Sequence, residues 1–357
     1  MKIGVVGNCQ MGGFVDCLRV LAPGHDLLVV RLDVDEPDRD LAGLSDALVA
    51  CDALFSQVVP SGPCGPLATD ALLPRAPGTI ILPSLAFGGF HPDCTYAWHG
   101  DGAPVIGPMG PYNSALALAC HHEGLPLDRA VRLFNAFTFA ALGYFDKFDN
   151  DTRVLRRQID ALGFDFGALT AEAPAVFMHV VNHPTIEVLF ALARAALRRV
   201  GIVPADAAIP ADRLAQKEVW PLFPEIAARI GRKGAFRIQD IVFKNEARRF
   251  DLRAMIEASY RAYAACAPFT MPPAAERARA FIRGEAPSRA VQRPVGVSVE
   301  DVKTAYRLIL GRECESDEMA QRQAQIRRDL AQLRRALILS PEFTAQLAEM
   351  GLHADPT

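Results

Sequence analysis

The chain opens on a short apolar run that predicts a buried β-strand. Residues 2–7 read Lys-Ile-Gly-Val-Val-Gly, and glycine ends the run. The apolar residues that follow share the spacing of one helix face: Phe14, Cys17, Leu18 and Leu21. Pro23-Gly24 then ends the pattern, so a strand, a turn and a helix are expected at the start of the chain.

Three further apolar runs predict strands at 27–32, 53–59 and 79–82. Because they alternate with helical segments, the pattern indicates an α/β fold with a doubly wound, mostly parallel sheet in about residues 1–113. From about 114 to 283 the periodicity is mainly that of helices, and one such helix carries its apolar face from Ile186 to Val200. We expect one domain over 1–283 with a helical second half.

A small all-α module is predicted at the end of the chain. Residues 284–297 hold Gly, Pro and Ser without periodicity and are typical of a linker, so the module spans 298–357. Ser298 and Asp301 form a capping-box pattern before an apolar helix face: Val302, Tyr306, Ile309 and Leu310. A last helix is expected to begin at Ser340, with Pro341 in its first turn.

Composition excludes several classes of protein. The 357 residues carry a net charge of −3, so no overall basic field would attract nucleic acid or anionic lipid. The N-terminal apolar run is too short for a signal peptide, and no stretch is long enough for a transmembrane segment, so a cytoplasmic protein is expected. Eight cysteines stand at irregular intervals without a CxxC pair, which favours free thiols and no metal site.

The turn after the first strand carries candidate chemistry. It reads Gly-Asn-Cys-Gln-Met-Gly-Gly, which places Cys9 at the carboxyl end of a strand and near a helix N-terminus. Free N–H groups there would stabilise a nucleophilic thiolate. Asn8, Gln10 and the backbone around Gly12 would supply oxyanion donors. A buried structural cysteine is the alternative, whereas the glycine spacing does not fit a dinucleotide-binding fingerprint.

Two histidines are candidate bases for Cys9. His91 follows the fourth strand, and Asp93 is near enough to orient its imidazole. Ser84 and the pair Gly88-Gly89, whose flexibility permits close approach of the backbone to a ligand, are candidate substrate-binding residues in the same loop. His183 follows Asn182 at the start of the predicted Ile186 helix, with Pro184 at its first position.

A helix N-terminus lowers an imidazole pKa and suits a neutral base, and it suits a bound phosphate equally. Structural roles remain the alternative for both histidines. A structural role is favoured for the other six: His25, His99, His121, His122, His179 and His353.

The motifs together resemble the WcbI family of bacterial capsular-polysaccharide biosynthesis enzymes. The similarity rests on GNCQ, PSLAFGGFHPD and VNHPT, spans about residues 1–265, and includes Asn135 and the WPLFPEIA stretch at Trp220. The resemblance implies an acyltransferase, in particular an O-acetyltransferase, that uses coenzyme A or acetyl-coenzyme A and modifies a sugar or glycan acceptor. By motif, Cys9 corresponds to the family's reactive cysteine, and the HPD and NHP segments correspond to those at His91 and His183.

Two chemical routes and two other protein classes stay open. Cys9 would carry the acetyl group itself, or a histidine would activate the sugar hydroxyl for direct attack. A cysteine-dependent ester hydrolase would need the same residues, and a non-catalytic nucleotide or sugar binder would not need Cys9.

Coenzyme A carries phosphates, so basic residues are expected near the cleft. The densest basic cluster near the motifs is Lys147, Arg153, Arg156 and Arg157, for which a solvated helix face is the alternative. The tail, with YRLILGRE and LILSPEF, resembles a helical module appended to bacterial surface and glycosyltransferase-associated proteins, which suggests a protein partner. It departs from that module after Gly311-Arg312, where the usual Gly- and Trp-containing middle is missing.

Overall fold

The computed structural model divides into two compact units, Met1–Pro287 and Ser288–Thr357. It describes residues 1–33, 39–60, 64–234, 238–239, 249–285 and 297–326, and within the remaining tail 332–333, 336–337, 340–342 and 345. The predicted linker, 284–297, lies largely outside the described residues.

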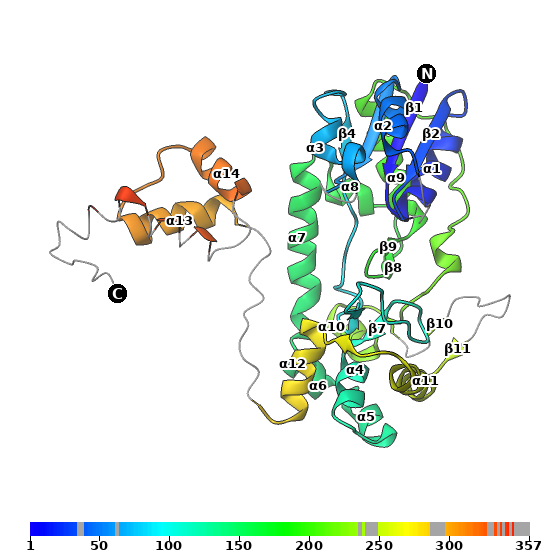
Figure 1. Ribbon diagram of the computed structural model, residues 1–357, viewed down its shortest axis with the longest axis vertical. Helices are drawn as coiled ribbons and strands as arrows, with labels where there is room; N and C mark the ends of the chain where they lie inside the picture. The colour runs from blue at the N-terminus through cyan, green and yellow to red at the C-terminus, as the bar shows by residue number, and fades with distance from the viewer. Residues whose placement is uncertain are drawn as a thin grey trace. The chain divides into compact units, whose positions relative to one another are not determined.

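A four-stranded parallel sheet lies at one end of the first unit, near the N-terminus in Figure 1. Its strands lie in the order β2-β1-β3-β4: β1 Lys2–Gly7, β2 Asp26–Arg31, β3 Ala53–Gln57 and β4 Ile80–Leu82. The prediction of four strands and a parallel sheet is confirmed, with boundaries that differ by one or two residues. Because β1 lies between β2 and β3, the chain order reverses across the sheet at β1, where open α/β sheets bind ligands.

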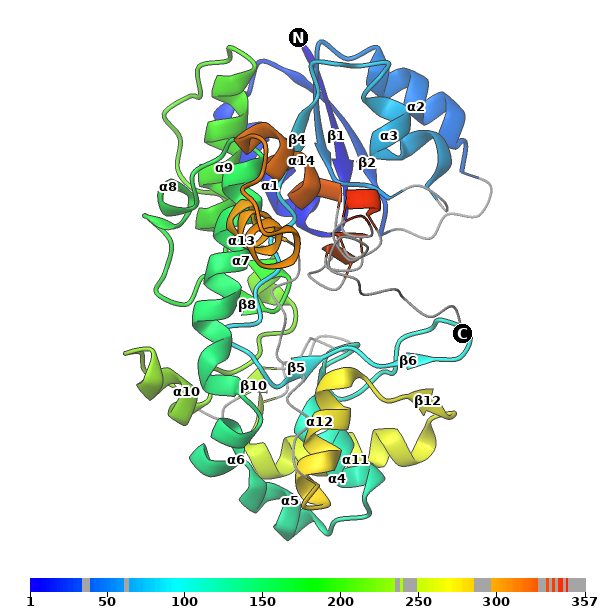
Figure 2. The same cartoon turned by 90° about the vertical axis from the view of Figure 1, so that its left-hand side faces the viewer.

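Helices cover both faces of the sheet, as Figure 2 shows, so the doubly wound arrangement is confirmed. On β1, Ile3 and Val5 belong to the large core, while Val6 belongs to a second, smaller one. Successive side chains of a strand point to opposite faces, which explains this division. One face packs against α1 (Gln10–Leu21) and α9 (Ile186–Arg199), and the other against α2 (Leu41–Val49) and α3 (Thr69–Leu72).

The rest of the first unit is mainly helical, as predicted. Its helices are α4 Ala115–His122, α5 Leu127–Leu133, α6 Ala136–Ala141, α7 Lys147–Ala161, α8 Phe166–Thr170, α10 Pro224–Arg229, α11 Leu252–Ala265 and α12 Pro273–Ile282. Short 3-10 turns are η1 Gly65–Leu67, η2 Tyr144–Asp146 and η3 Leu214–Gln216. Four two-stranded pairs are β5 Cys94–Thr95 with β7 Asn113–Ser114, β6 Trp98–His99 with β12 Phe269–Thr270, β8 Met178–Val180 with β9 His183–Pro184, and β10 Ile238–Gln239 with β11 Arg249–Phe250.

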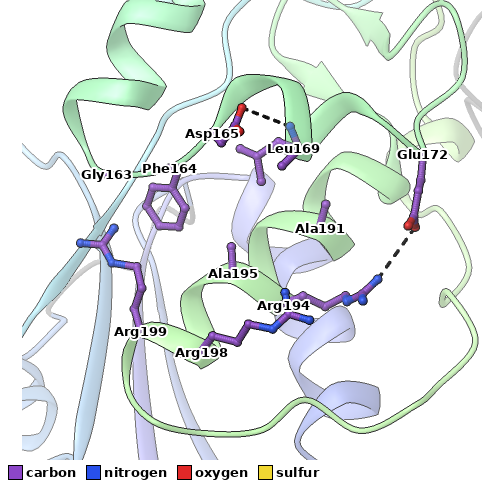
Figure 3. Close-up of a pocket in the computed structure, with 11 residues that line it drawn as sticks. Gly163, Phe164, Asp165, Leu169, Glu172, Ala191, Arg194, Ala195, Arg198 and Arg199 are labelled. Carbon is purple, nitrogen blue, oxygen red and sulfur yellow. Dashed lines mark hydrogen bonds and ion pairs between the residues drawn. The ribbon is translucent and has the colours of Figure 1, made fainter.

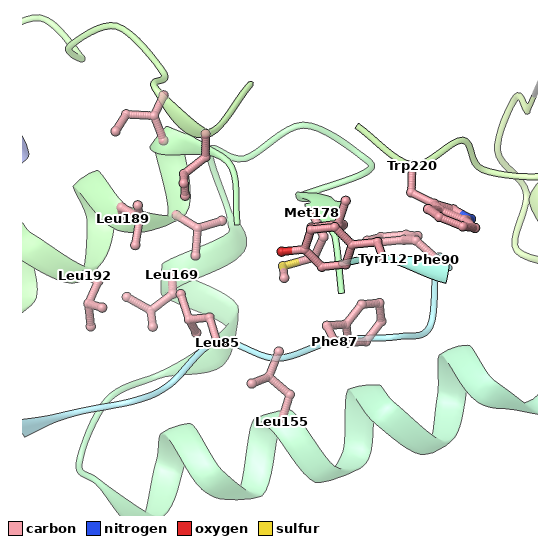
Figure 4. Close-up of a cluster of buried hydrophobic side chains, with 14 of the residues drawn as sticks. Leu85, Phe87, Phe90, Tyr112, Leu155, Leu169, Met178, Leu189, Leu192 and Trp220 are labelled. Carbon is pink, nitrogen blue, oxygen red and sulfur yellow. The ribbon is translucent and has the colours of Figure 1, made fainter. Parts of the chain in front are cut away.

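A buried aromatic cluster joins the loop after β4 to α7 (Figure 4). Phe87 and Phe90 pack with ring centroids 5.0 Å apart, and each also contacts Phe148 of α7. A Cβ at Gly89 would lie 2.5 Å from the Phe87 ring and 2.8 Å from the Cα of Phe148. The backbone of Gly88-Gly89 was expected to approach a ligand closely. At Gly89 the backbone closely approaches α7 instead.

The second unit is a small helical module. Its described helices are α13 Val299–Leu310 and α14 Asp317–Ile326. The predicted capping box of Ser298 and Asp301 is present, and Val302, Tyr306 and Leu310 are buried. Gly311 ends α13 in the left-handed conformation, at φ 66°. Most of the predicted helix after Ser340 lies outside the described residues.

Candidate functional site

Cys9 lies at the carboxyl edge of the sheet, directly after the central strand β1. It is the N-cap residue of α1 and is partly exposed. The Oδ1 atom of Asn8 accepts a 3.0 Å hydrogen bond from the backbone N–H of Gln10, which fixes the turn. Cys9 therefore lies where the carboxyl ends of the parallel strands meet, which is where open α/β sheets bind ligands.

His183 lies beside Cys9 in space. The Cys9 Sγ atom is 3.9 Å from the Nε2 atom of His183. His183 belongs to β9 rather than to the first turn of a helix, because Thr185 is extended and is the N-cap of α9. The expected position of Pro184 at the start of that helix is wrong: Pro184 pairs with Met178 in the β8–β9 ribbon.

The electrostatics of Cys9 differ from the expected thiolate. Burial raises the pKa of the Cys9 thiol and Asp33 raises it further, while Lys217 and Arg31 oppose both. The bond from the backbone N–H of Cys9 lowers the pKa by less than burial raises it, because a charged sulfur is costly to bury. With its pKa raised above the ordinary value of a thiol, Cys9 is neutral at neutral pH.

The imidazole of His183 is neutral, as expected, although burial rather than the helix terminus is the main cause. Burial, together with the charges of Lys217 and His179, lowers the pKa of His183 to about 4. Its Nδ1 atom is buried without a hydrogen-bond partner among the described residues. With the proton on Nδ1, the lone pair of Nε2 faces the thiol of Cys9 and can accept its proton.

Tyr112 completes this group, and sequence reasoning missed it. Its hydroxyl donates to Oδ1 of Asn182 at 2.7 Å and lies 3.2 Å from Nε2 of His183. Tyr96 stands next to it, with ring centroids 5.1 Å apart. The only signal in the sequence was an aromatic residue directly after a Gly- and Pro-rich turn at 107–111.

Gln10 joins the three motifs that sequence reasoning had singled out. Its buried amide group donates to the carbonyl oxygens of Leu85 and Asn182, both at 2.8 Å. Its Oε1 atom accepts from Gln57 at 3.1 Å, and Gln57 in turn accepts from the N–H of Asn8 at 2.9 Å. Because both amide hydrogens are used, Gln10 holds the site together and has none left for an oxyanion.

Other polar groups of the turn stay available. For the Nδ2 atom of Asn8, no partner is found among the described residues. A Cβ at Gly12 would meet nothing within 4 Å, and Ser84 is exposed just after β4. Asn8 and the backbone of the turn are therefore the donors that can face a substrate.

His91 and Asp93 are fully buried, and they do not pair as expected. The ring nitrogens of His91 face the carbonyl oxygens of Pro221, at 3.4 Å, and Met178, at 3.2 Å. Asp93 accepts hydrogen bonds from Ser114, the N–H of Leu116 and Tyr144 instead. Burial lowers the pKa of His91 to about 4, so the ring is neutral and can donate its one N–H to only one of these carbonyls. Its burial and these contacts indicate a structural role.

The predicted phosphate cluster lies on α7. Lys147 pairs with Asp151 at 2.6 Å, Arg153 with Asn150, and Arg156 lies over the ring of Phe166. Arg157 is exposed. The cations whose charge reaches Cys9 are instead Arg31, at the end of β2, and Lys217 after η3.

His179 was assigned a structural role, yet it takes part in a second polar pair near the site. Its Nε2 atom lies 2.8 Å from Asp212, which also accepts from the N–H of Ile186 at the start of α9. Burial would raise the pKa of Asp212, but the bond from His179 and the other donors lower it below its usual range. No sequence pattern pointed to Asp212.

A cavity of about 410 Å³ lies between α8 and the C-terminal half of α9 (Figure 3). Arg194, Arg198 and Arg199 line it, and Arg199 donates to the carbonyl of Leu162 at 2.7 Å. His183 precedes the opposite end of α9, so this cavity is separate from the Cys9 group. In the described part of the chain, no helix is both long and apolar enough to cross a membrane.

Comparison with known proteins gives one match. A protein-family model described as polysaccharide biosynthesis enzyme WcbI matches residues 2–205. This range includes Cys9, Tyr112 and His183 but ends before Lys217 and Trp220. The motifs had predicted a longer similarity, to about residue 265. No curated protein and no solved structure matches the chain.

Proposed function

Since the chain belongs to the WcbI family of polysaccharide biosynthesis enzymes, we propose that it is a coenzyme A-dependent O-acetyltransferase that acts on a sugar of a bacterial surface polysaccharide. Cys9 is the nucleophile and His183 is its base. The observation that carries the proposal is the 3.9 Å approach of the Cys9 thiol to a neutral, buried imidazole. A thiol and a general base within reach of each other are what nucleophilic acyl transfer requires.

The first half of the reaction transfers the acetyl group to the enzyme. The Cys9 sulfur attacks the thioester carbonyl carbon while Nε2 of His183 takes the thiol proton. The coenzyme A thiolate then leaves and takes that proton. Because one thioester is exchanged for another, this step is nearly balanced in energy.

The second half returns the thiol. A sugar hydroxyl attacks the acetyl-Cys9 carbonyl, His183 takes the hydroxyl proton, and the Cys9 sulfur leaves and is reprotonated. Whenever Nε2 of His183 is protonated, it can donate to the Tyr112 oxygen 3.2 Å away, which stabilises the imidazolium. The Nδ2 atom of Asn8 and the N–H of Cys9 are the donors proposed to bind the developing oxyanion.

Two cations fit the phosphates of coenzyme A better than the cluster on α7. Arg31 and Lys217 both lower the pKa of Cys9, so both act at the thiol. Lys217 is exposed, and Arg31 pairs with Asp33. The α1 N-terminus beside them adds N–H groups and a partial positive charge.

Mass spectrometry of the Cys9 peptide after incubation with acetyl-coenzyme A tests this proposal. We expect one added acetyl group on Cys9, lost in Cys9→Ser and retained in the control Cys64→Ser, because Cys64 lies in the separate small core. If Cys9 is not modified and Cys9→Ser still transfers the acetyl group, the remaining mechanism is direct attack of the sugar hydroxyl on acetyl-coenzyme A, with His183 as the base. Rapid loss of the acetyl group to water without any sugar would favour the ester hydrolase.

A further inference from the structure

We infer that the acceptor sugar binds on the ring of Trp98, at the outer end of a row of aromatic side chains that leads to the Cys9–His183 pair. The inference rests on the proposed function for the identity of the acceptor. Its structural basis is the packing of Trp98, Tyr96 and Tyr112 against one another, which does not depend on the identity of the ligand.

The aromatic rings of the row follow one another without a gap from the surface to His183, the proposed general base. Trp98 stacks on Tyr96 with centroids 5.7 Å apart and planes 17° apart. Tyr96 packs against Tyr112 at 5.1 Å, and Tyr112 meets the ring of His183 edge-on at 5.7 Å. The row therefore connects the exposed ring of Trp98 to the buried rings of Tyr112 and His183, beside the partly exposed Cys9.

Trp98 is exposed at the surface, whereas the other tryptophan, Trp220, is buried. Trp98 keeps 48% of its surface accessible although one ring face is covered by Tyr96. Its backbone is held firmly, because β6 pairs with β12 through Thr270 and Trp98 also bridges to Pro104. Contact between an exposed apolar ring and water is unfavourable. A ligand that covers the Trp98 ring would therefore gain binding free energy.

The chemistry of the row suits a sugar. An aromatic face carries the negative lobe of its quadrupole, which attracts the weakly positive C–H groups on one face of a pyranose. The hydroxyl group of Tyr96 and the amide of Asn182 lie further in, and both side chains are partly exposed and can bond the sugar hydroxyls. Apolar walls with a few placed polar groups are typical of small-ligand sites.

An adenine ring would also stack on Trp98, but the charge of this segment argues against the nucleotide end of coenzyme A. No lysine or arginine of the described residues is among the groups that shift the pKa of Tyr96 or Tyr112, and Glu218 raises the pKa of Tyr112. The cations that act at Cys9 are Arg31 and Lys217, so the phosphates are assigned to these cations and the sugar to the aromatic row.

Fluorescence can test this directly, because the chain has two tryptophans and Trp220 is buried. In a Trp220→Phe background, Trp98 is the single reporter. We would screen the protein on an array of oligosaccharides from bacterial capsules and O-antigens, and titrate the glycans that bind. We expect glycan binding to change the Trp98 emission, and Trp98→Ala to weaken that binding at least about tenfold, with Trp98→Tyr restoring most of it.

The exposed Phe137→Ala is the matched control, because Phe137 lies on α6, outside the row. The inference fails if no glycan binds, or if Trp98→Ala binds the same glycans as tightly as the parent protein. It also fails if Trp98→Ala instead weakens acetyl-coenzyme A binding, which would assign the ring to adenine. Glycan binding that depends on Trp98 without any acetyl-Cys9 would keep this inference and reject the proposed transferase.

Discussion

The Sγ atom of Cys9 lies 3.9 Å from Nε2 of His183, although 174 residues separate the two in the chain. The approach is built by two local structures that meet at the carboxyl edge of the sheet. One is the turn from β1 into α1, and the other is the β8–β9 ribbon that leads into α9. Packing of α1 against α9 then fixes the distance between them, with a Cβ at Gly13 only 2.7 Å from Leu189.

Cys9 should react slowly with iodoacetamide at neutral pH, despite its position at a helix N-terminus. Burial, and then Asp33, raise the pKa of its thiol, so the reactive thiolate accumulates only at higher pH. We expect the midpoint of the pH profile to lie above that of the same cysteine in the urea-denatured chain. The measurement is the rate of alkylation of the Cys9 peptide by mass spectrometry. A native midpoint below the denatured one would restore the thiolate hypothesis and make His183 unnecessary as the base for Cys9.

Tyr112→Phe should slow acetylation of Cys9 about 10- to 100-fold without changing the affinity for acetyl-coenzyme A. The hydroxyl removed lies 3.2 Å from the atom that becomes charged, and a hydrogen bond to a charged group contributes about 1.5–3 kcal/mol. Single-turnover kinetics measures the rate and calorimetry the affinity. Tyr260→Phe is the control, since its hydroxyl also bonds a carbonyl, that of Leu125, but in the helical half. Equal rates for the two variants would remove Tyr112 from the mechanism.

Gln10→Ala should destabilise the fold as well as the site. The variant leaves the buried carbonyls of Leu85 and Asn182 without their donor, at a cost on the order of 2–4 kcal/mol for the two. Urea unfolding measures the loss, and the exposed Gln158→Ala on α7 should show almost none. Unchanged stability in Gln10→Ala would mean that Gln10 does not hold the three motifs together.

The sequence predicted the sheet and the place of the site because both depend on local patterns. Four apolar runs with intervening helices dictate a parallel sheet, and a polar Cys9 turn after the first strand must lie at its carboxyl edge. The pairing of His183 with Cys9 rather than of Asp93 with His91 depends on tertiary packing. No spacing reveals that Asp93 faces Ser114 and Tyr144.

The direction of the Cys9 pKa shift shows the same limit. A helix N-terminus can be predicted from the sequence, but the burial that raises the pKa of Cys9 depends on the folded chain, in which His183 lies beside the thiol. Lys217 and Arg31 could not be chosen over the cluster on α7, because charge density along a chain says little about distance in space. Tyr112 was missed for the same reason, since its role depends on Asn182 and His183, about 70 residues later.

Two neighbouring motifs contain glycines that should respond in opposite ways to alanine. Gly89→Ala would place a methyl group 2.5 Å from the Phe87 ring and 2.8 Å from the Cα of Phe148, and a backbone atom of α7 cannot move aside easily. We expect a loss of about 1–3 kcal/mol, the usual cost of overpacking a core. Gly12→Ala meets nothing within 4 Å on the first turn of α1, so alanine should leave stability unchanged or raise it by up to about 1 kcal/mol. Thermal unfolding of both variants measures the difference in stability. Equal stabilities would mean that the loop after β4 is not packed as closely against α7 at Gly89 as the structure shows.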